Sequence, residues 1–540
     1  MYNPSTSAQR PVLILGEQDL TLEQIAQVAS GKLQVSLTQN TAVLSRVKQA
    51  YDYIQQAIQE DKLIYGVNSG FGGMADVRIS KEETEELQNN ALWFLRTGTG
   101  KPIANEDVRA AMLIRAHSHL YGASGVRLAL IERMILFLNQ NVTPQVFEYG
   151  SIGASGDLVP LSHITGALIG ADASYKVDFN GVEMDAISAL EKLGLSPLRL
   201  HGKEGLAMVN GTSVTTAIAA RNIYRAKELF QYTLEFHGAA MQGLNANPES
   251  FEPYIHQLKP HSGQINVAQK LHHLLAGSQL TRDHSYEQDE LAQDRYSIRC
   301  APQYLGPIEE GLTFIEQQIT QEVNSVTDNP LIDFAEDKVY HGGNFLAQYV
   351  GIGMDQLRYY IGLLAKHIDV QIAMLVHPEF SNQLPKSLVG NSNRSVNMGL
   401  KGLQICGNSM MPMLTFLGNT FVDRFPTHAE QFNQNINSLG YGSALFARES
   451  LEILQRYLAI ASIFAVQSVD LRCYLIHQHY CGNEAIAPQL KSFYEAVYQS
   501  IEKIPAKAEP MIFDDNQQCL SSYIQQIFDM IEERISRKND

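Results

Sequence analysis

The feature that most constrains the fold of this chain is a series of long segments whose apolar residues recur with the period of an α-helix. Several exceed twenty residues, which is longer than an ordinary globular helix. Helices this long, apolar on more than one face, predict a central bundle whose outer faces pack against other subunits. The segments are residues 212–244, 265–277, 307–326, 345–376, 398–420, 441–469, 485–502 and 516–536.

The first 200 residues have a different, mixed pattern. Residues 12–15 predict a short strand, residues 21–30 a helix, and Asn180-Gly181 the turn of a hairpin. The change of pattern predicts two domains, residues 1–200 and 201–540. The expected fold class is mainly α, with a long central helical bundle and a mixed, mostly helical N-terminal domain. Further helices are predicted at about 80–97, 105–120, 125–140 and 186–193.

Composition excludes several classes of partner. The 540 residues carry 41 Lys and Arg against 57 Asp and Glu, a net charge of −16, which argues against nucleic acid and anionic membranes as partners. The five cysteines are scattered without a C-x-x-C pair, so we expect no metal site, no disulfide framework and a cytoplasmic location. The most apolar stretch, residues 359–376, is interrupted by polar residues and predicts a buried helix that does not span a membrane.

A glycine-rich turn at residues 150–163 is the first candidate for function. It has three glycines within seven residues, and Asp157 then precedes an apolar run as a helix N-cap would. A small-residue loop entering a helix N-terminus can stabilise negative charge, although such turns are also common as purely structural features. A phosphate loop is not predicted, because no Lys-Ser/Thr follows the glycines and Asp157 would repel phosphate.

Other polar groups gather in the breaks between the long segments. Residues 293–299 hold two arginines, a tyrosine and an amide, which suits a carboxylate but also a solvated, salt-bridged loop. Asn210 opens a long helix, where an N-cap and a functional role are compatible. The glycine-rich stretch 65–75 is too long for a turn. The Asn- and Gln-rich stretch 427–438 either satisfies buried backbone groups or lines a polar site.

Taken together, these segments resemble the histidine/phenylalanine/tyrosine ammonia-lyase and aminomutase family, and within it most the compact bacterial phenylalanine ammonia-lyases. The resemblance spans about residues 12–475, and the string GASGDLVPLS is its most specific element. It implies the histidine/phenylalanine ammonia-lyase-like fold and a homotetramer whose active sites combine loops of three subunits. The matching stretches are residues 65–72, 150–162, 203–212, 293–299, 324–330, 342–345 and 428–438.

The resemblance also implies a cofactor that the chain makes from itself. In this family an Ala-Ser-Gly triplet, here Ala154-Ser155-Gly156, cyclises when the glycine nitrogen attacks the alanine carbonyl and two waters are lost. The product is 4-methylidene-imidazol-5-one (MIO), an electrophile that needs no external cofactor or metal. Tyr65 resembles the base of the family. Its pKa, ordinarily about 10, would have to be lowered, and we expect Arg299 or Arg295 and helix N-termini to lower it.

Further roles carry over residue by residue. Arg299 is expected to pair with the substrate carboxylate beside Asn329, and Glu430 to contact the amino group. The catalytic set implied is Tyr65, Ala154, Ser155, Gly156, Tyr296 and Glu430. The substrate-binding set implied is Phe94, Leu95, Leu206, Asn210, Gln293, Arg299, Asn329, Phe345, Lys401 and Gln434.

The apolar residues Phe94 and Leu95 indicate the substrate. Tyrosine-specific relatives carry His at the position of Phe94, and histidine-specific relatives carry His at the position of Leu95. With Leu206 as a third apolar wall, a buried phenol or imidazole would lack a partner, at a cost of about 1–3 kcal/mol. The expected reaction is elimination of ammonia from phenylalanine to give trans-cinnamate. Phenylalanine 2,3-aminomutase, tyrosine or histidine ammonia-lyase, and a catalytically silent scaffold of the same fold stay open as alternatives.

Overall fold

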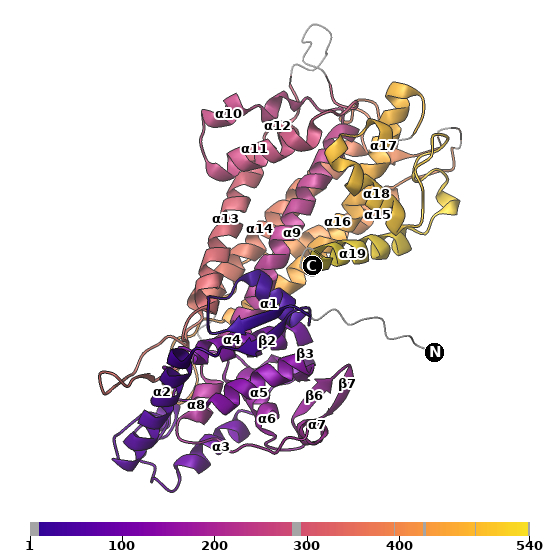
Figure 1. Ribbon diagram of the computed structural model, residues 1–540. Helices are drawn as coiled ribbons and strands as arrows, with labels where there is room; N and C mark the ends of the chain where they lie inside the picture. Colours follow the sequence, from indigo (N-terminus) through magenta and orange to yellow (C-terminus); the bar gives the residue numbers. More distant parts are fainter. Residues whose placement is uncertain are drawn as a thin grey trace.

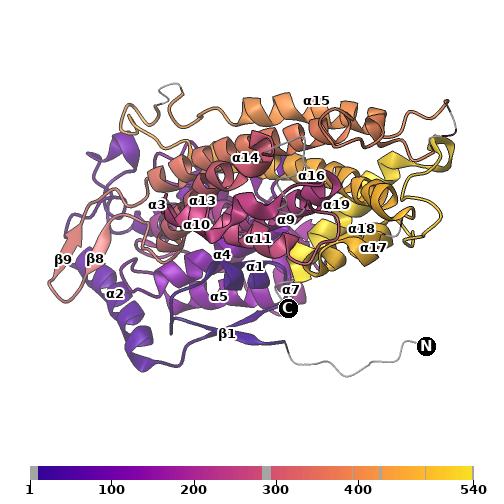
Figure 2. The ribbon, with the colours of Figure 1, turned by 90° about the horizontal axis from the view of Figure 1, so that it is seen from above.

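Long helices running side by side dominate the computed structural model, which describes residues 10–282, 293–391, 393, 395–424, 428–480 and 482–537 (Figures 1 and 2). The central helices α9, α14 and α16 pack against one another. Helix α13 flanks α9 and α14, α15 covers α14 and α16, and α19 lies on α16. Their bounds are α9 (Ser213–Gly243), α13 (Ala301–Val323), α14 (Gln348–Leu375), α15 (Lys401–Leu417), α16 (Gly440–His477) and α19 (Leu520–Arg537).

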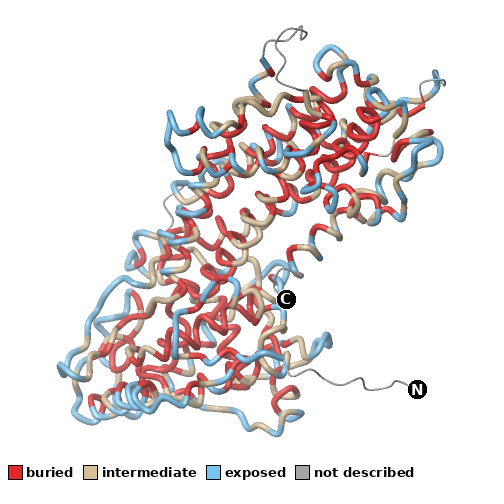
Figure 3. Tube along the Cα trace, turned by 45° about the horizontal axis from the view of Figure 1, so that its top comes forward, coloured by how far each residue is buried: buried red, intermediate tan, exposed pale blue. Residues whose placement is uncertain are grey.

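The centre of the bundle is buried on all sides. Every residue of α16 from Tyr457 to Cys473 is buried, and Figure 3 shows the buried segments running along the axis of the molecule. Helix α16 is also the one helix of the described residues that is long and apolar enough to cross a membrane, and 83% of its apolar window is buried inside the structure. Burial of that kind is what the core helix of a bundle shows. The most apolar stretch is therefore in α16, and the choice of residues 359–376 from the sequence was wrong.

The N-terminal region lies at one end of the bundle, coloured indigo to purple in Figure 1. Helices α1 and α4 of this region pack on each other and on α9, and so attach the region to the bundle. Its helices are α1 (Leu22–Ala29), α2 (Thr41–Gln59), α3 (Thr84–Phe94), α4 (Asn105–His119), α5 (Leu128–Asn139), α6 (Leu158–Ile169), α7 (Ala186–Lys192) and α8 (Glu204–Val209).

The strands are short and peripheral. Strands β1 (Val12–Leu15) and β2 (Gln34–Leu37) pair in parallel. The other pairings are antiparallel. They involve β3 (Thr99–Pro102) with β5 (Phe147–Tyr149), β4 (Val142–Pro144) with β6 (Lys176–Phe179), β6 with β7 (Val182–Asp185), and β8 (Leu331–Asp333) with β9 (Lys338–Tyr340).

The opposite end of the bundle carries shorter helices, and the turn α12 (Tyr296–Arg299) lies there, far from the N-terminal region (Figure 1). This placement matters for the active site, because α12 holds two of the predicted site residues. The other short helices are α10 (Pro253–Gln257), α11 (Ser262–Leu275), α17 (Gly482–Ala485) and α18 (Lys491–Ser500).

The structure confirms the mainly α fold and the hairpin at Asn180-Gly181, where β6 meets β7. Two helix predictions need correction. The helix expected over 485–502 begins only at Lys491, because Pro488 opens a separate single turn. The helix expected from 307 begins at Ala301, because a proline in the first turn, here Pro302, needs no N–H. The domain boundary near residue 200 stays a prediction.

Candidate active site

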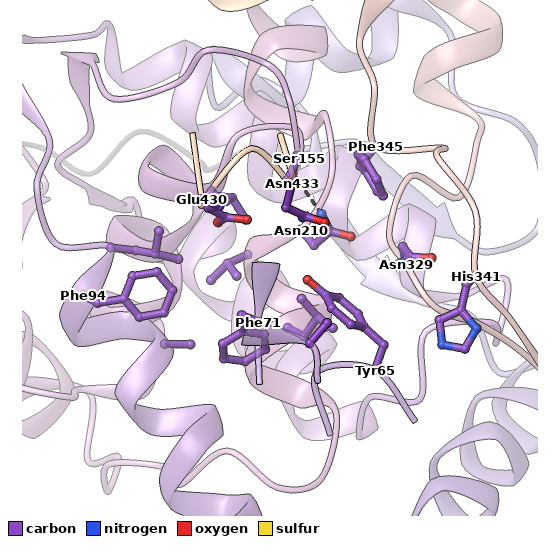
Figure 4. A pocket seen from close by; sticks show the side chains of 16 residues that line it. Tyr65, Phe71, Phe94, Ser155, Asn210, Asn329, His341, Phe345, Glu430 and Asn433 are labelled. Atoms are coloured by element: carbon purple, nitrogen blue, oxygen red, sulfur yellow. Dashed lines mark hydrogen bonds between the residues drawn. The ribbon is translucent and has the colours of Figure 1, made fainter. Parts of the chain in front are cut away.

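A pocket of about 300 Å³ lies between loops of the N-terminal region and the loops that precede α14 and α16. Figure 4 shows the Tyr65 hydroxyl pointing into it, with Phe71 and Phe94 together on one side and Asn329, Phe345 and His341 on the other. The pocket therefore has an aromatic end and a polar wall. It is lined by Tyr65, Phe71, Ala75, Ala91, Phe94, Leu95, Ser155, Leu158, Leu206, Val209, Asn210, Asn329, His341, Phe345, Glu430 and Asn433.

Two side-chain amides hold Ser155 at the pocket wall. The Nδ2 of Asn210, in the turn between α8 and α9, donates to the Ser155 carbonyl oxygen at 2.9 Å. The Nε2 of Gln434, in the loop before α16, donates to the Ser155 hydroxyl at 2.9 Å. Because one donor binds the carbonyl and the other binds the side chain, the two hydrogen bonds fix the orientation of Ser155 towards the cavity.

Gly156 allows the triplet to press against the α8–α9 turn. Its φ is +70°, and a Cβ there would lie 2.1 Å from the carbonyl oxygen of Gly211, a contact that no side chain could relieve. The next residue completes the contact, since the Asp157 N–H donates to the same oxygen at 2.7 Å. The backbone at this position therefore requires glycine.

Asp157 caps a different helix from the one predicted. It directly precedes α6, but its side chain makes no bond to that helix. Its carboxylate accepts instead from the N–H groups of Val214 (2.9 Å) and Thr215 (2.7 Å), in the first turn of α9. Burial raises the pKa of this carboxyl, and the bonds from Thr215 and its neighbours oppose that shift. Through Asp157, the triplet is thus attached to the first turn of the bundle helix α9.

This arrangement also corrects the prediction for Asn210 as an N-cap. The N-cap position of α9 is Thr212, and Asn210 directly follows α8. Asp157 satisfies N–H groups in the first turn of α9, and the Asn210 Nδ2 donates to the Ser155 carbonyl oxygen instead of taking part in that cap.

Tyr65 and Glu430 meet at the glycine-rich loop. The half-buried Tyr65 accepts a hydrogen bond from the Gly72 N–H at 2.8 Å through its hydroxyl oxygen. Gly72 has a φ of +56°, and a Cβ there would lie 2.2 Å from the Glu430 Oε2, so a side chain would strain the backbone and displace that carboxylate. The loop at 65–75 therefore serves two predicted catalytic residues at once.

The electrostatics of Tyr65 differ from expectation. Burial raises the pKa of Tyr65, the Gly72 N–H opposes the shift, and the Glu430 charge adds to it. Burial likewise raises the pKa of Glu430, against hydrogen bonds from Asn433 and Gln434. The expectation that Arg299 or Arg295 lowers the Tyr65 pKa is wrong for a single chain, because both lie at the opposite end of the bundle (Figure 1).

Seven predicted site residues do not line the pocket among the described residues. Ala154 and Gly156 flank Ser155, and Gln434 donates to it, so these three lie beside the pocket. The other four are Gln293, Tyr296, Arg299 and Lys401. The Arg299 guanidinium stacks 4.5 Å from the ring centre of Tyr296, whose side chain is 72% exposed. Lys401 is exposed at the first position of α15, and Gln293 is exposed just before α12. Tyr296 and Arg299 thus form a pair away from the pocket of their own chain.

Seven residues that line the pocket had no role assigned from the sequence. Four are aliphatic, namely Ala75, Ala91, Leu158 and Val209, and three are aromatic or polar, namely Phe71, His341 and Asn433. Phe71 packs with its ring centre 6.2 Å from that of Phe94, and His341 lies edge-on to Tyr65 at 6.5 Å. All three lie in or beside stretches that carry the resemblance, so adjacency within those motifs was the available signal.

Comparisons with known proteins agree with this geometry. A family model described as aromatic amino acid lyase matches residues 20–499. The phenylalanine ammonia-lyase of Nostoc punctiforme is 56% identical over 529 residues, covering 97% of this chain and 93% of that protein. The histidine ammonia-lyase of Geobacillus kaustophilus is 37% identical over 472 residues, covering 87% and 89%.

A solved structure extends the agreement to the fold. The phenylalanine aminomutase of Pantoea agglomerans superposes with a TM-score of 0.86 at 30% identity, covering 96% of this chain and 98% of that one. The match thus includes the N-terminal region, the bundle and the pocket between them. The chain belongs to the aromatic amino acid lyase family and is a carbon–nitrogen lyase of the ammonia-lyase type.

Proposed function

We propose that this protein is a phenylalanine ammonia-lyase, which eliminates ammonia from L-phenylalanine to give trans-cinnamate. The observation that carries the proposal is the Ala154-Ser155-Gly156 bend, held by two amides and facing Tyr65 across a pocket with an aromatic end. Similarity to the phenylalanine ammonia-lyase of Nostoc punctiforme supports it.

The triplet fits the self-formed MIO group. The glycine at 156 presents a nitrogen without a neighbouring Cβ, which the attack on the Ala154 carbonyl requires. The group would supply an electrophilic alkene that turns the substrate amine into a better leaving group. Asn210 places an N–H donor 2.9 Å from the carbonyl oxygen of Ser155, where negative charge would develop.

The remaining pocket residues have complementary tasks. Phe71, Phe94, Leu95 and Leu206 are apolar and would hold the substrate ring. Tyr65, pointing into the cavity, would remove the benzylic proton. The Glu430 carboxylate would accept a hydrogen bond from the amino group. Removal of a weakly acidic proton beside a bound electrophile is the chemistry this arrangement serves.

We further propose that the active enzyme is a homotetramer whose sites are shared between subunits. Gln293, Tyr296, Arg299 and Lys401 would then enter the pocket of another copy. Large apolar side chains stand exposed on one side of α14 and on α15, among them Tyr359 (56%), Ile405 (67%) and Phe416 (74%). An apolar surface of that kind is typical of a subunit interface. A carboxylate-binding arginine from a partner would also supply the cation that lowers the Tyr65 pKa.

A mixing experiment tests this sharing. Tyr65→Phe and Arg299→Ala copies, each strongly impaired alone, are expected to regain part of the parental activity when co-expressed, because some pockets then receive Tyr65 from one copy and Arg299 from another. Cinnamate formation by the purified mixed enzyme is the measurement. Activity no higher than the sum of the two impaired variants would refute a site shared between these residues.

Phe94→His is expected to raise the preference for tyrosine over phenylalanine about tenfold or more. The imidazole would give the substrate phenol a partner where the parent has only an apolar wall, an effect of about 1–3 kcal/mol. The measurement is the ratio of kcat/KM for the two substrates, with Phe94→Leu as the control that keeps the wall apolar. An unchanged ratio would show that Phe94 does not contact the ring.

The test of the proposed function is product analysis with phenylalanine. Accumulation of cinnamate and ammonia supports the lyase. The second candidate is phenylalanine 2,3-aminomutase, favoured by the similarity to the aminomutase of Pantoea agglomerans. Accumulation of β-phenylalanine would select it and reject the lyase, and a preference for tyrosine or histidine would reject the assignment of substrate.

A further inference from the structure

A pair of buried histidines lies directly beneath the α12 turn. His367 of α14 has its Nε2 2.8 Å from the Ser297 carbonyl oxygen, and its Nδ1 2.8 Å from the Nε2 of His237 in α9. Gln371, one turn further along α14, donates to the same Ser297 oxygen at 2.7 Å. The two histidines are 4% and 0% exposed, so the core of the bundle holds this one carbonyl with two donors.

The chemistry of the acceptors fixes the proton positions. A carbonyl oxygen can only accept, so His367 carries its proton on Nε2 and donates to Ser297. A neutral ring then has a bare Nδ1, which must accept from the Nε2–H of His237. Burial lowers the pKa of His367 to about 4 and holds that of His237 far below its usual value, so both rings are neutral. Each hydrogen bond is therefore donated in the same direction, from His237 of α9 to His367 of α14 and from His367 to the α12 turn.

The turn that receives these bonds carries Tyr296 on one side of Ser297 and Arg299 on the other. Arg299 has little support of its own. Its guanidinium stacks on Tyr296, and its Nε is buried without a hydrogen-bond partner among the described residues. The position of the guanidinium therefore depends on the backbone of the turn. His367 in addition stacks on Tyr304 of α13, with ring centres 5.2 Å apart, which fixes its own orientation.

We propose that His367, supported by His237 and Gln371, is a positioning residue that fixes the α12 turn and thereby sets where Arg299 meets the substrate carboxylate. The inference rests on the proposed function, in which Arg299 binds that carboxylate. His367 does not touch substrate. It acts through Ser297, so its loss should weaken recognition of the carboxylate and leave recognition of the ring unchanged.

The experiment compares two inhibitors of nearly the same shape on the assembled full-length enzyme, the anionic cinnamate and its neutral amide, cinnamamide. In His367→Phe, which keeps the stacking on Tyr304, we expect KM for phenylalanine and Ki for cinnamate to rise about tenfold, as the loss of a buried hydrogen bond allows. Ki for cinnamamide should change less than about twofold, since the amide lacks the charge that Arg299 pairs with. His367→Gln, which presents an N–H at the same distance from the backbone, should restore cinnamate binding to within about threefold of the parent.

A matched control is His256→Phe. His256 is also buried at 1% exposure, with its Nε2 3.0 Å from the Ser250 carbonyl and its Nδ1 3.0 Å from Gln264, and within the part of the chain that the structure describes it makes no hydrogen bond to α12. It should lower stability without separating the two Ki values. Gln371→Leu, which removes one donor and leaves the histidines in place, provides the same test if His367→Phe does not fold.

Three results would overturn the inference: equal changes in both Ki values, a His367→Gln enzyme as impaired as His367→Phe, or the same separation in His256→Phe. Parental turnover of phenylalanine is measured in the same assay. A parent without that activity refutes the proposed function, whereas the ratio of the two Ki values in the variants refutes the positioning role alone.

Discussion

Ser155→Ala is expected to fold like the parent and to lose turnover of phenylalanine by roughly 10³-fold or more, as removal of a covalent reacting group does in other enzymes. Relative to the uncyclised chain, the substitution deletes one oxygen, and with it the acceptor of the Gln434 hydrogen bond, at a cost in unfolding free energy of about 1 kcal/mol. Without that hydroxyl the second water cannot leave, and the electrophile cannot form. Cinnamate formation and thermal unfolding are the two measurements.

Ser118→Ala is the matched control for this variant. It deletes a buried hydroxyl elsewhere in the chain, one that donates to the Ser325 carbonyl at 3.0 Å and does not line the pocket. It should keep near-parental activity at a comparable loss of stability. Full turnover by Ser155→Ala would remove Ser155 from the chemistry and leave the glycine-rich turn as a structural element.

Tyr65→Phe is expected to lower kcat by about 10²–10⁴, the range for loss of a general base, with a much smaller change in KM. The ring stays in the pocket, and only the hydroxyl that accepts from Gly72 is lost. Tyr232→Phe, which removes a buried hydroxyl 2.8 Å from Ser462 inside the bundle, is the control and should stay active. Parental kcat in Tyr65→Phe would reject the tyrosine as the base.

The pH dependence of the same pair of enzymes tests the role of Tyr65 further. A base must lose its proton before it acts, so the activity of the parent should rise with pH through the Tyr65 pKa. Burial in a single chain raises that pKa, and a cation from a neighbouring subunit would bring it down in the assembled enzyme. The residual activity of Tyr65→Phe should lack this rising limb.

Periodicity and local motifs predict most of the fold. Apolar recurrence locates α9, α14 and α16 because their buried faces repeat with the helix, and Asn180-Gly181 locates a hairpin because few residues accept that turn. Local patterns fail where the partner of a group is distant in sequence. Asp157 is followed by α6, yet it caps α9.

In the pocket, too, local motifs predict which residues take part but not the contacts that depend on distant parts of the chain. The resemblance identifies Tyr65, Ser155, Asn210 and Glu430, and the structure brings these together from four separate stretches of the chain. It cannot say that Arg299 lies at the other end of the same chain, because that distance depends on the packing of complete helices. The direction of the Tyr65 pKa shift could not be predicted either, since burial and charge act through space.

The central claim is that Ala154, Ser155 and Gly156 become an electrophile, and the intact mass of the purified, denatured parent protein tests it most directly. A mass short of the encoded value by two water molecules, together with the encoded mass for Ser155→Ala, is the predicted result. A parent protein at its full encoded mass would contradict the account.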